Sequence, residues 1–385
     1  MDTTFRNIDR VAEALSRMAI RRRWAVVVAA VLFAVIAGTG ARHLEFASNY
    51  RVFFSDENPE LAAFEELQAT YTKNDNFLFV IEPTTGDVFS ATTLAAIETL
   101  TSRAWEIPYA IRVDSISNFQ HTHGVEDDLV VEDLFSDAAT MVEAERRRRG
   151  DIALAEPLLR DQLVTGDGRA TAVNVVLQYP ERSITEVPEA VAVARDIRAE
   201  IESSFPGLDV SVTGVSMLNN AFAEVGFENL GVLVPLMFVV IVALTVAALR
   251  SIAATAATVV VIVLSTLVAM GTAGYAGIKL DPISASAPII ILTLAIADSI
   301  HVLIALRGAG RSNMDRDDAI VEAVRINLIP VTITSLTTVV GFLALNFSDS
   351  PPFWYLGNIT AVGILAAWIY SLVLLPALIR VLPYR

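Results

Sequence analysis

The chain has 385 residues, 54% of them hydrophobic, with a mean hydropathy of +0.54. This composition is too apolar for an ordinary soluble enzyme and indicates an integral membrane protein. The net charge of −15 is unevenly spread, since residues 42–228 carry 33 acidic and 14 basic side chains while the remainder is slightly basic. An acidic soluble part argues against nucleic acid as a partner.

The chain begins with an amphipathic segment followed by a first apolar stretch. Ile8, Val11, Leu15 and Met18 recur at helical spacing, which predicts a short surface helix within a cytoplasmic segment at residues 1–23. Three arginines at positions 21–23 precede a first span predicted at residues 24–41. By the positive-inside rule, they place the N-terminus in the cytoplasm and the next segment outside.

Residues 42–228 are predicted to form an external α+β domain. Two strand–helix–strand units fit a ferredoxin-like sandwich, in which two helices cover one sheet. The predicted segments are, in order, residues 76–81, 91–107, 112–117, 169–179, 187–205 and 209–215. Residues 118–159, between the two units, are charged and predicted to be mainly helical.

Two polar runs in this domain invite a functional interpretation. Arg146 to Arg149 is a solvated helix end or, as the alternative, a site for an anionic ligand. His121 and His123 lie in an exposed loop or, as the alternative, bind a metal; without cysteine or a suitable acid nearby, no metal site is expected.

Residues 229–385 are predicted to contain five further spans. The spans are residues 230–249, 252–277, 288–306, 328–347 and 355–379, with a polar surface helix expected at residues 308–323. Most basic residues of the connecting segments fall on the side that alternation makes cytoplasmic, as the positive-inside rule requires. They are Arg250, Arg307, Arg311, Arg316, Arg325, Arg380 and Arg385.

The fourth of the six spans carries ionisable side chains in its apolar centre. Asp298 and His301 are three residues apart, so a helix can direct both into the same space. A carboxylate at mid-membrane depth costs at least about 2.5–3.5 kcal/mol, and intramembrane acids are functional by default. Asp298 is therefore a candidate proton site. The alternative is a buried acid that hydrogen-bonds a neighbouring helix for packing specificity.

The fifth span is rich in hydroxyl groups, including those of Thr332, Thr334, Ser335, Thr337 and Thr338. Thr334 and Thr338 share a face at i, i+4, with Thr337 beside them, and this strip could hydrogen-bond Asp298 and hold water for proton entry. The alternative is that the hydroxyls bond to carbonyls of their own helix, which is common in membrane helices. The predicted proton relay consists of Asp298, His301, Thr334, Ser335, Thr337 and Thr338.

Several motifs together are similar to those of a known transporter superfamily. Six spans with a large loop after the first, an acid in span four and the TSLTT run of span five resemble one half of a resistance–nodulation–division (RND) transporter. The branch of MMPL-like hydrophobe and lipid exporters is the most similar. Segments NYRVFFSDENPELAAFEEL, LVTGDGRATAVNVVL, IADSIHVL and LLPALI, at residues 49–67, 163–177, 296–303 and 374–379, resemble that branch.

The resemblance implies a protein of the bacterial inner membrane that exports a hydrophobic or lipid substrate using the proton motive force. It assigns the proton carrier to Asp298. Many relatives have Gly where this chain has Leu294, four residues before the acid, which changes helix packing there. The alternatives are an accessory subunit of protein translocation, like the Sec pair of the same superfamily, and a lipid-sensing scaffold without transport.

The expected partners are membrane lipids and a second six-span half, because members of this branch usually carry two such halves. The second half is another copy, in a homodimer, a missing C-terminal half or a different half-size partner. We expect it to cover an outward polar side that carries Asp298, His301 and the Thr334–Thr338 strip. The alternative is that the fourth span turns Asp298 inward within its own six helices.

The sequence has no GxxxxGK[ST] phosphate loop, nucleophile elbow or zinc motif. We therefore expect that the protein is not an enzyme and binds no cofactor, and that protons are its coupling ion.

Overall fold

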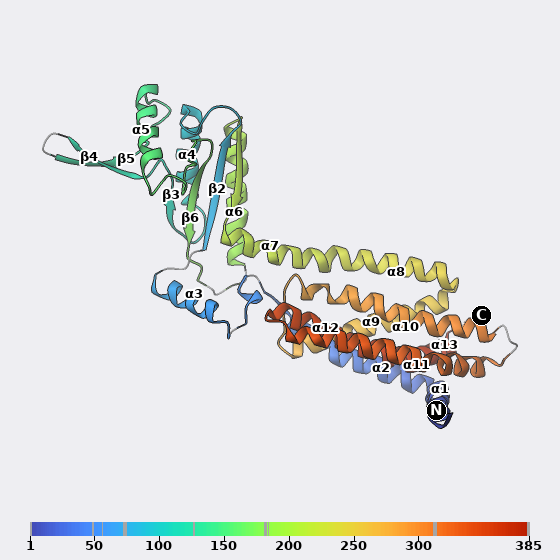
Figure 1. Cartoon of the computed structure of the whole chain (residues 1–385). Helices are drawn as coiled ribbons and strands as arrows, with labels where there is room; N and C mark the ends of the chain where they lie inside the picture. Colours follow the sequence, from blue (N-terminus) through green and yellow to red (C-terminus); the bar gives the residue numbers. More distant parts are fainter. Residues whose placement is uncertain are drawn as a thin grey trace. The chain divides into compact units, whose positions relative to one another are not determined.

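The computed structural model describes residues 2–47, 50–55, 57–71, 75–125, 128–180, 183, 185–310 and 314–382. It divides into two compact units, shown in Figure 1. The membrane unit comprises Met1–Ala47, Arg51–Ser55 and Phe222–Arg385, and the α+β domain comprises Ser48–Tyr50 and Asp56–Ala221. The predicted fold class, a polytopic helical membrane protein with an α+β domain, is confirmed.

Within the described residues, six helical stretches are long and apolar enough to cross a membrane. They are Arg23–His43, Val215–Leu249, Ile252–Tyr275, Ser284–Ala309, Arg316–Phe347 and Pro351–Val381. The main helices that form them are α2 (Arg23–Gly38), α7 (Val215–Glu228), α8 (Val234–Leu249), α9 (Ile252–Tyr275), α10 (Ala287–Gly310), α11 (Arg316–Leu343), α12 (Pro351–Ile369) and α13 (Leu375–Val381). The second to sixth spans alternate in direction, because each follows the last through a short connection. The first span runs in the direction of the third, since the strands β1 (Glu45–Phe46) and β8 (Lys279–Leu280) that follow them pair in parallel.

The polar segment before the fifth span differs from its prediction as a separate surface helix. α10 continues to Gly310, and α11 begins at Arg316 and runs on without interruption into the apolar span. Asp315 determines where α11 begins, because its carboxylate accepts a hydrogen bond from the Asp317 amide and so caps the first turn of the helix. Arg311 and Arg385, two of the predicted inner arginines, lie outside the described residues.

Two of the six spans contain a π-helical turn just before a proline. Asn229–Leu233 precedes Pro235 in the second span, and Tyr370–Leu374 precedes Pro376 in the sixth. Proline lacks an amide hydrogen and clashes with the carbonyl four residues earlier, which weakens the α-helical hydrogen bonding there, although α11 stays α-helical across Pro330. A wider turn at this point accommodates the ring while the chain remains helical.

α2 and α9 approach each other unusually closely. A Cβ atom on Gly271 would overlap the carbonyl oxygen of Ala37, and one on Gly274 would overlap that of Gly40. The short strands β1 (Glu45–Phe46) and β8 (Lys279–Leu280) pair in parallel just beyond these helices. Small residues therefore bring the first and third spans into backbone contact, as is typical of membrane helix pairs.

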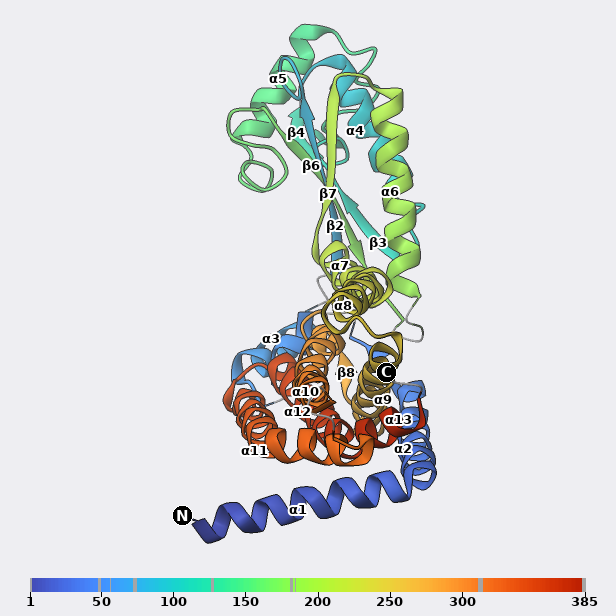
Figure 2. The same ribbon diagram turned by 90° about the vertical axis from the view of Figure 1, so that its right-hand side faces the viewer.

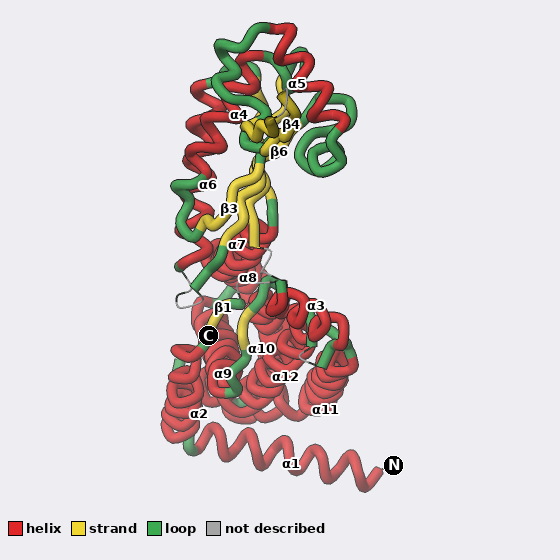
Figure 3. The backbone as a smooth tube through the Cα atoms, turned by 90° about the vertical axis from the view of Figure 1, so that its left-hand side faces the viewer, coloured by secondary structure: helices red, strands yellow, loops and turns green. Residues whose placement is uncertain are grey.

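The α+β domain has the predicted ferredoxin-like topology. Its sheet has the order β3-β6-β2-β7 with antiparallel neighbours, and the helices α4 and α6 connect the strands (Figure 3). The elements are β2 (Asp75–Pro83), α4 (Ala91–Ala104), β3 (Ala110–Asp114), β6 (Thr171–Leu177), α6 (Glu186–Ser204) and β7 (Leu208–Thr213).

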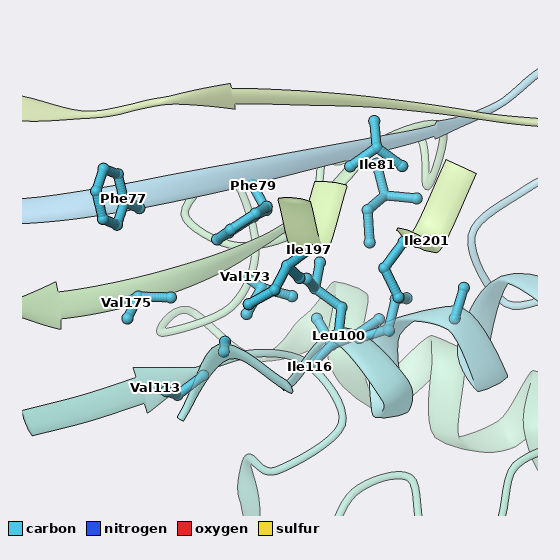
Figure 4. Packing of buried hydrophobic residues seen from close by; sticks show 14 of the residues in the cluster. Phe77, Phe79, Ile81, Leu100, Val113, Ile116, Val173, Val175, Ile197 and Ile201 are labelled. Atoms are coloured by element: carbon cyan, nitrogen blue, oxygen red, sulfur yellow. The ribbon is translucent and has the colours of Figure 1, made fainter. Parts of the chain in front are cut away.

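The core of this domain lies between one sheet face and the two helices. Alternate residues of β2 and β6, among them Phe77, Phe79 and Val175, point to the helices, where Leu100 and Ile197 meet them (Figure 4). The intervening residues of the same strands line the opposite face. That second face remains partly open within the domain.

The segment between the two strand–helix–strand units was predicted to be mainly helical, which is wrong for its first half. It forms a hairpin of β4 (Gln120–Val125) and β5 (Asp128–Asp133) before α5 (Glu143–Ala155). One face of the hairpin is half-buried, but it carries His121, His123 and Glu132, so the sequence lacks the apolar alternation by which a half-buried strand is recognised. The remaining helices are α1 (Asp2–Arg21) and α3 (Pro59–Thr70).

We predict that Gly271→Ala lowers the stability of the protein by about 1–3 kcal/mol, since the added methyl group forces α2 and α9 apart. The matched control is Gly341→Ala on α11, where no atom lies within 4 Å of the new Cβ. Thermal unfolding of both variants in detergent checks this expectation. Equal melting temperatures for the two variants would show that the close contact of α2 and α9 does not contribute to stability.

Candidate functional site

The candidate site lies near the middle of the 24-residue helix α10. The side chain of Asp298 is only 7% exposed, and its Oδ2 atom accepts a hydrogen bond of 2.9 Å from the Ser335 hydroxyl on α11. Asp298 thus points into its own six-helix unit. The expectation that it lies on an outward polar side, to be covered by a second half, is wrong for this residue.

Ser335 reaches Asp298 because of its position on α11. Val331, Ser335 and Val339 are spaced four residues apart and are all buried, so they form one inward-facing stripe. The valines pack against the neighbouring helices and fix the rotation of α11 about its axis. This rotation directs the Ser335 hydroxyl, and not those of the flanking threonines, to the acid.

The other predicted hydroxyls of α11 bond to their own helix. Thr334 donates to the carbonyls of Pro330 and Val331, Thr337 to those of Ile333 and Thr334, and Thr338 to that of Thr334. This is the alternative that the sequence left open for such residues. In this structure their hydroxyl groups do not reach Asp298, so they remain relay candidates only through water.

His301 lies on the outward face of α10, where it is exposed. Three residues correspond to about 300° of helical rotation, so His301 is offset from Asp298 by about 60° around the axis. This offset is enough to place one side chain inside the bundle and the other on its surface. The two groups therefore do not share one buried space, although the His301 imidazole lies within electrostatic reach of the Asp298 carboxyl.

A second polar contact, missed in the sequence, lies next to Asp298. The Ser299 hydroxyl donates to the Ala295 carbonyl at 3.0 Å and lies 3.3 Å from the hydroxyl of Ser371. Ser371 belongs to the π-helical turn of the sixth span, and both serines are fully buried. The sequence contains one indication of this contact, which is that Ser371 lies five residues before Pro376 in an otherwise apolar run.

The polar runs of the α+β domain have structural partners. Arg147 pairs with Glu143, while Arg148 and Arg149 both pair with Glu145. Hydrogen bonds from Arg148 and then Arg149 lower the pKa of the Glu145 carboxyl to about 2. Arg147 and Arg148 thus form a solvated, ion-paired helix face. Arg149 is mostly buried and pairs with Glu132 as well, and Arg146 donates to the Met141 carbonyl.

The rings of His121 and His123 stack on β4 with their centroids 5.3 Å apart. Within the described part of the chain, no group of three side chains suited to a metal ion is found.

Six apolar spans, an α+β domain after the first and a buried acid in the fourth define the class: a polytopic membrane protein built like half of an RND transporter. The MMPL family model matches residues 58–385, and the chain belongs to the MMPL family. This result confirms the resemblance read from the motifs.

One relative is a protein of Methanocaldococcus jannaschii named only as a membrane protein, MJ1562. It is 28% identical over 222 residues, which cover 57% of this chain and 56% of the relative. The match therefore spans little more than half of either chain, and the relative's printed name states no substrate.

We predict that Ser335→Ala destabilises the protein by about 1–3 kcal/mol, because a buried carboxyl group loses its hydrogen-bond partner. Thr337→Ala is the matched control, since its hydroxyl only bonds back to α11. Thermal unfolding of the two variants in detergent would reveal the difference. If Ser335→Ala cost no more than Thr337→Ala, the contact with Asp298 would contribute nothing to stability.

Proposed function

We propose that the chain is a proton-driven exporter, or half of one, for hydrophobic or amphiphilic substrates such as lipids. The observation that carries this proposal is the buried carboxyl group of Asp298, hydrogen-bonded to Ser335 in the middle of a spanning helix. Asp298 is the proton carrier and His301, one turn away, tunes it. A charge that crosses 100 mV supplies about 2.3 kcal/mol, enough for one or two protons to bias a conformational switch.

The open face of the α+β domain supports an amphiphilic substrate. It carries a cavity of about 1040 Å³ whose lining is mixed in character. Leu78, Phe119 and Leu158 supply apolar surface, while Arg112 and Asn174 supply hydrogen-bond donors. Such a lining suits a molecule that has both an apolar part and a polar head.

We propose in addition that a second six-span half packs against α10 and α11. Their outward faces carry Thr293, Ala297 and His301 on α10, and Thr334 and Thr337 on α11. Polar and small side chains on a membrane helix face are typical of helix–helix contacts, and an ionisable group is costly against lipid. The second half is another copy of this chain or a separate half.

The basic residues at one end of the bundle support a cytoplasmic N-terminus in a cell membrane. Arg250 ends α8, Arg307 lies in the last turn of α10, Arg316 begins α11 and Arg380 lies in the last turn of α13. Since consecutive spans alternate in direction, all four lie at the end from which α2 starts. The positive-inside rule assigns that end to the cytoplasm.

We expect Asp298→Asn to abolish transport without loss of membrane insertion. Asparagine keeps the shape of the side chain but cannot carry a proton, and it removes a group that is costly to ionise within the bilayer. Uptake of a fluorescent lipid into inverted vesicles, driven by an imposed pH gradient, measures the effect. Asp349→Asn, in a loop outside the spans, is the control and should transport normally. Transport by Asp298→Asn at the unmodified rate would refute the carrier role.

We expect cysteines at Ala297 and Thr337 to cross-link between chains in native membranes, because both positions lie on the proposed contact face. The sequence has no native cysteine to interfere. Leu244→Cys is the control, since Leu244 is 62% exposed on α8, away from this face. Transport by chains that show no cross-link at either position would contradict the proposed pairing.

A further inference from the structure

The N-terminal helix α1 runs crosswise to the spanning helices and alongside the bundle, as Figure 2 shows in a view along those helices. It packs against α11 and α13 near the end from which α2 starts. A helix in this position lies parallel to the membrane plane, at the level where the spans leave the apolar core. It therefore occupies the headgroup region on one side of the bundle.

The inner face of α1 is held firmly against the membrane unit. Ala12, Ser16, Ala19 and Ile20 are buried, and Ile20 joins the same apolar cluster as Ile320 and Val324 of α11.

Two ion pairs fix the rotation of α1. Arg325 lies 3.2 Å from Asp9, and Arg17 lies 3.1 Å from Asp318, both measured between charged side-chain atoms. Both partners belong to the first half of α11, so the helix is fastened on two sides of its buried face. The two ion pairs therefore determine which residues of α1 point away from the bundle.

The outward face combines an apolar strip with arginines. Val11 and Met18 are 60% and 42% exposed, and Ala14 lies between them on the same face. Arg10 and Arg21 flank this strip on one side, and Arg22, which follows the end of α1, is exposed as well. In the part of the chain that the structure describes, these three arginines form no ion pair, unlike Arg17.

We propose that the outward face of α1 binds the headgroups of anionic phospholipids in the surrounding leaflet. The apolar strip enters the boundary between headgroups and acyl chains, and the free guanidinium groups bind phosphate oxygens. Trp24, 62% exposed at the start of α2, is a residue type that favours this same interface. The charge of the surface selects anionic over zwitterionic lipid, independently of what the protein transports.

The test uses the full chain with one cysteine, Ala14→Cys, carrying a bimane fluorophore. The protein is reconstituted into vesicles of equal phosphatidylglycerol and phosphatidylcholine, and the bromine quencher is placed on one lipid or the other. We expect brominated phosphatidylglycerol to quench at least about twofold more strongly, because each arginine near the surface attracts anionic lipid. Raising the ionic strength to about 1 M should reduce this ratio, since the Debye length then falls to about 3 Å.

The charge variant Arg10→Gln, Arg21→Gln, Arg22→Gln should bring the quenching ratio close to one. The corresponding lysine variant should keep most of it, and Arg147→Gln with Arg148→Gln, in the α+β domain, should leave it unchanged. Equal quenching by both lipids in the unmodified background would overturn the proposal. Weak quenching by both would do so as well, because the face would then be covered by water or protein. The salt dependence decides the matter even if the charge variant fails to fold.

Discussion

A carboxyl group inside an apolar bundle sets the main constraint on the membrane unit. Hydrocarbon offers no water to hydrogen-bond a polar group, so Asp298 is tolerable only where protein supplies a partner. Ser335 meets this need from α11, and the adjacent Ser299 meets Ser371 from the sixth span. These two adjacent residues of α10 therefore connect it by polar contacts to α11 and to the sixth span. The apolar packing around them determines which helix face can take part.

The sequence was sufficient for the features that depend on composition along one helix. The six spans follow from length and apolarity, and Asp298 stands out because a charge there has no local explanation. The rotation of each helix could not be predicted in this way. The strip of Thr334, Thr337 and Thr338 was the predicted partner of Asp298, and only the burial of Val331 and Val339 shows that Ser335 takes that place. This stripe is visible in the sequence, but its direction depends on contacts with other helices.

In the α+β domain, too, some features could be predicted from the sequence and others could not. The apolar residues of β2 and β6 made both strands predictable, and their order follows from two strand–helix–strand units. The hairpin β4–β5 was not predictable, because its half-buried face carries polar side chains such as those of His121, His123 and Glu132. The run of arginines on α5 carries little information about function for a related reason. Charges at i, i+3 and i+4 satisfy one another on a solvated helix and require no ligand.

The π-helical turn of the sixth span connects the candidate site to the mechanics of the bundle. Pro376 has no amide hydrogen, so the ladder of helical hydrogen bonds is already interrupted where Ser371 contacts Ser299. A shift between α and π geometry at this turn sacrifices fewer hydrogen bonds than it would elsewhere in the span. Asp298 directly precedes Ser299 on α10, so the ionisable group and this π-helical turn are linked through two adjacent residues. If a proton at Asp298 drives transport, the part of the bundle whose helix geometry changes most easily therefore lies next to the site where the charge changes.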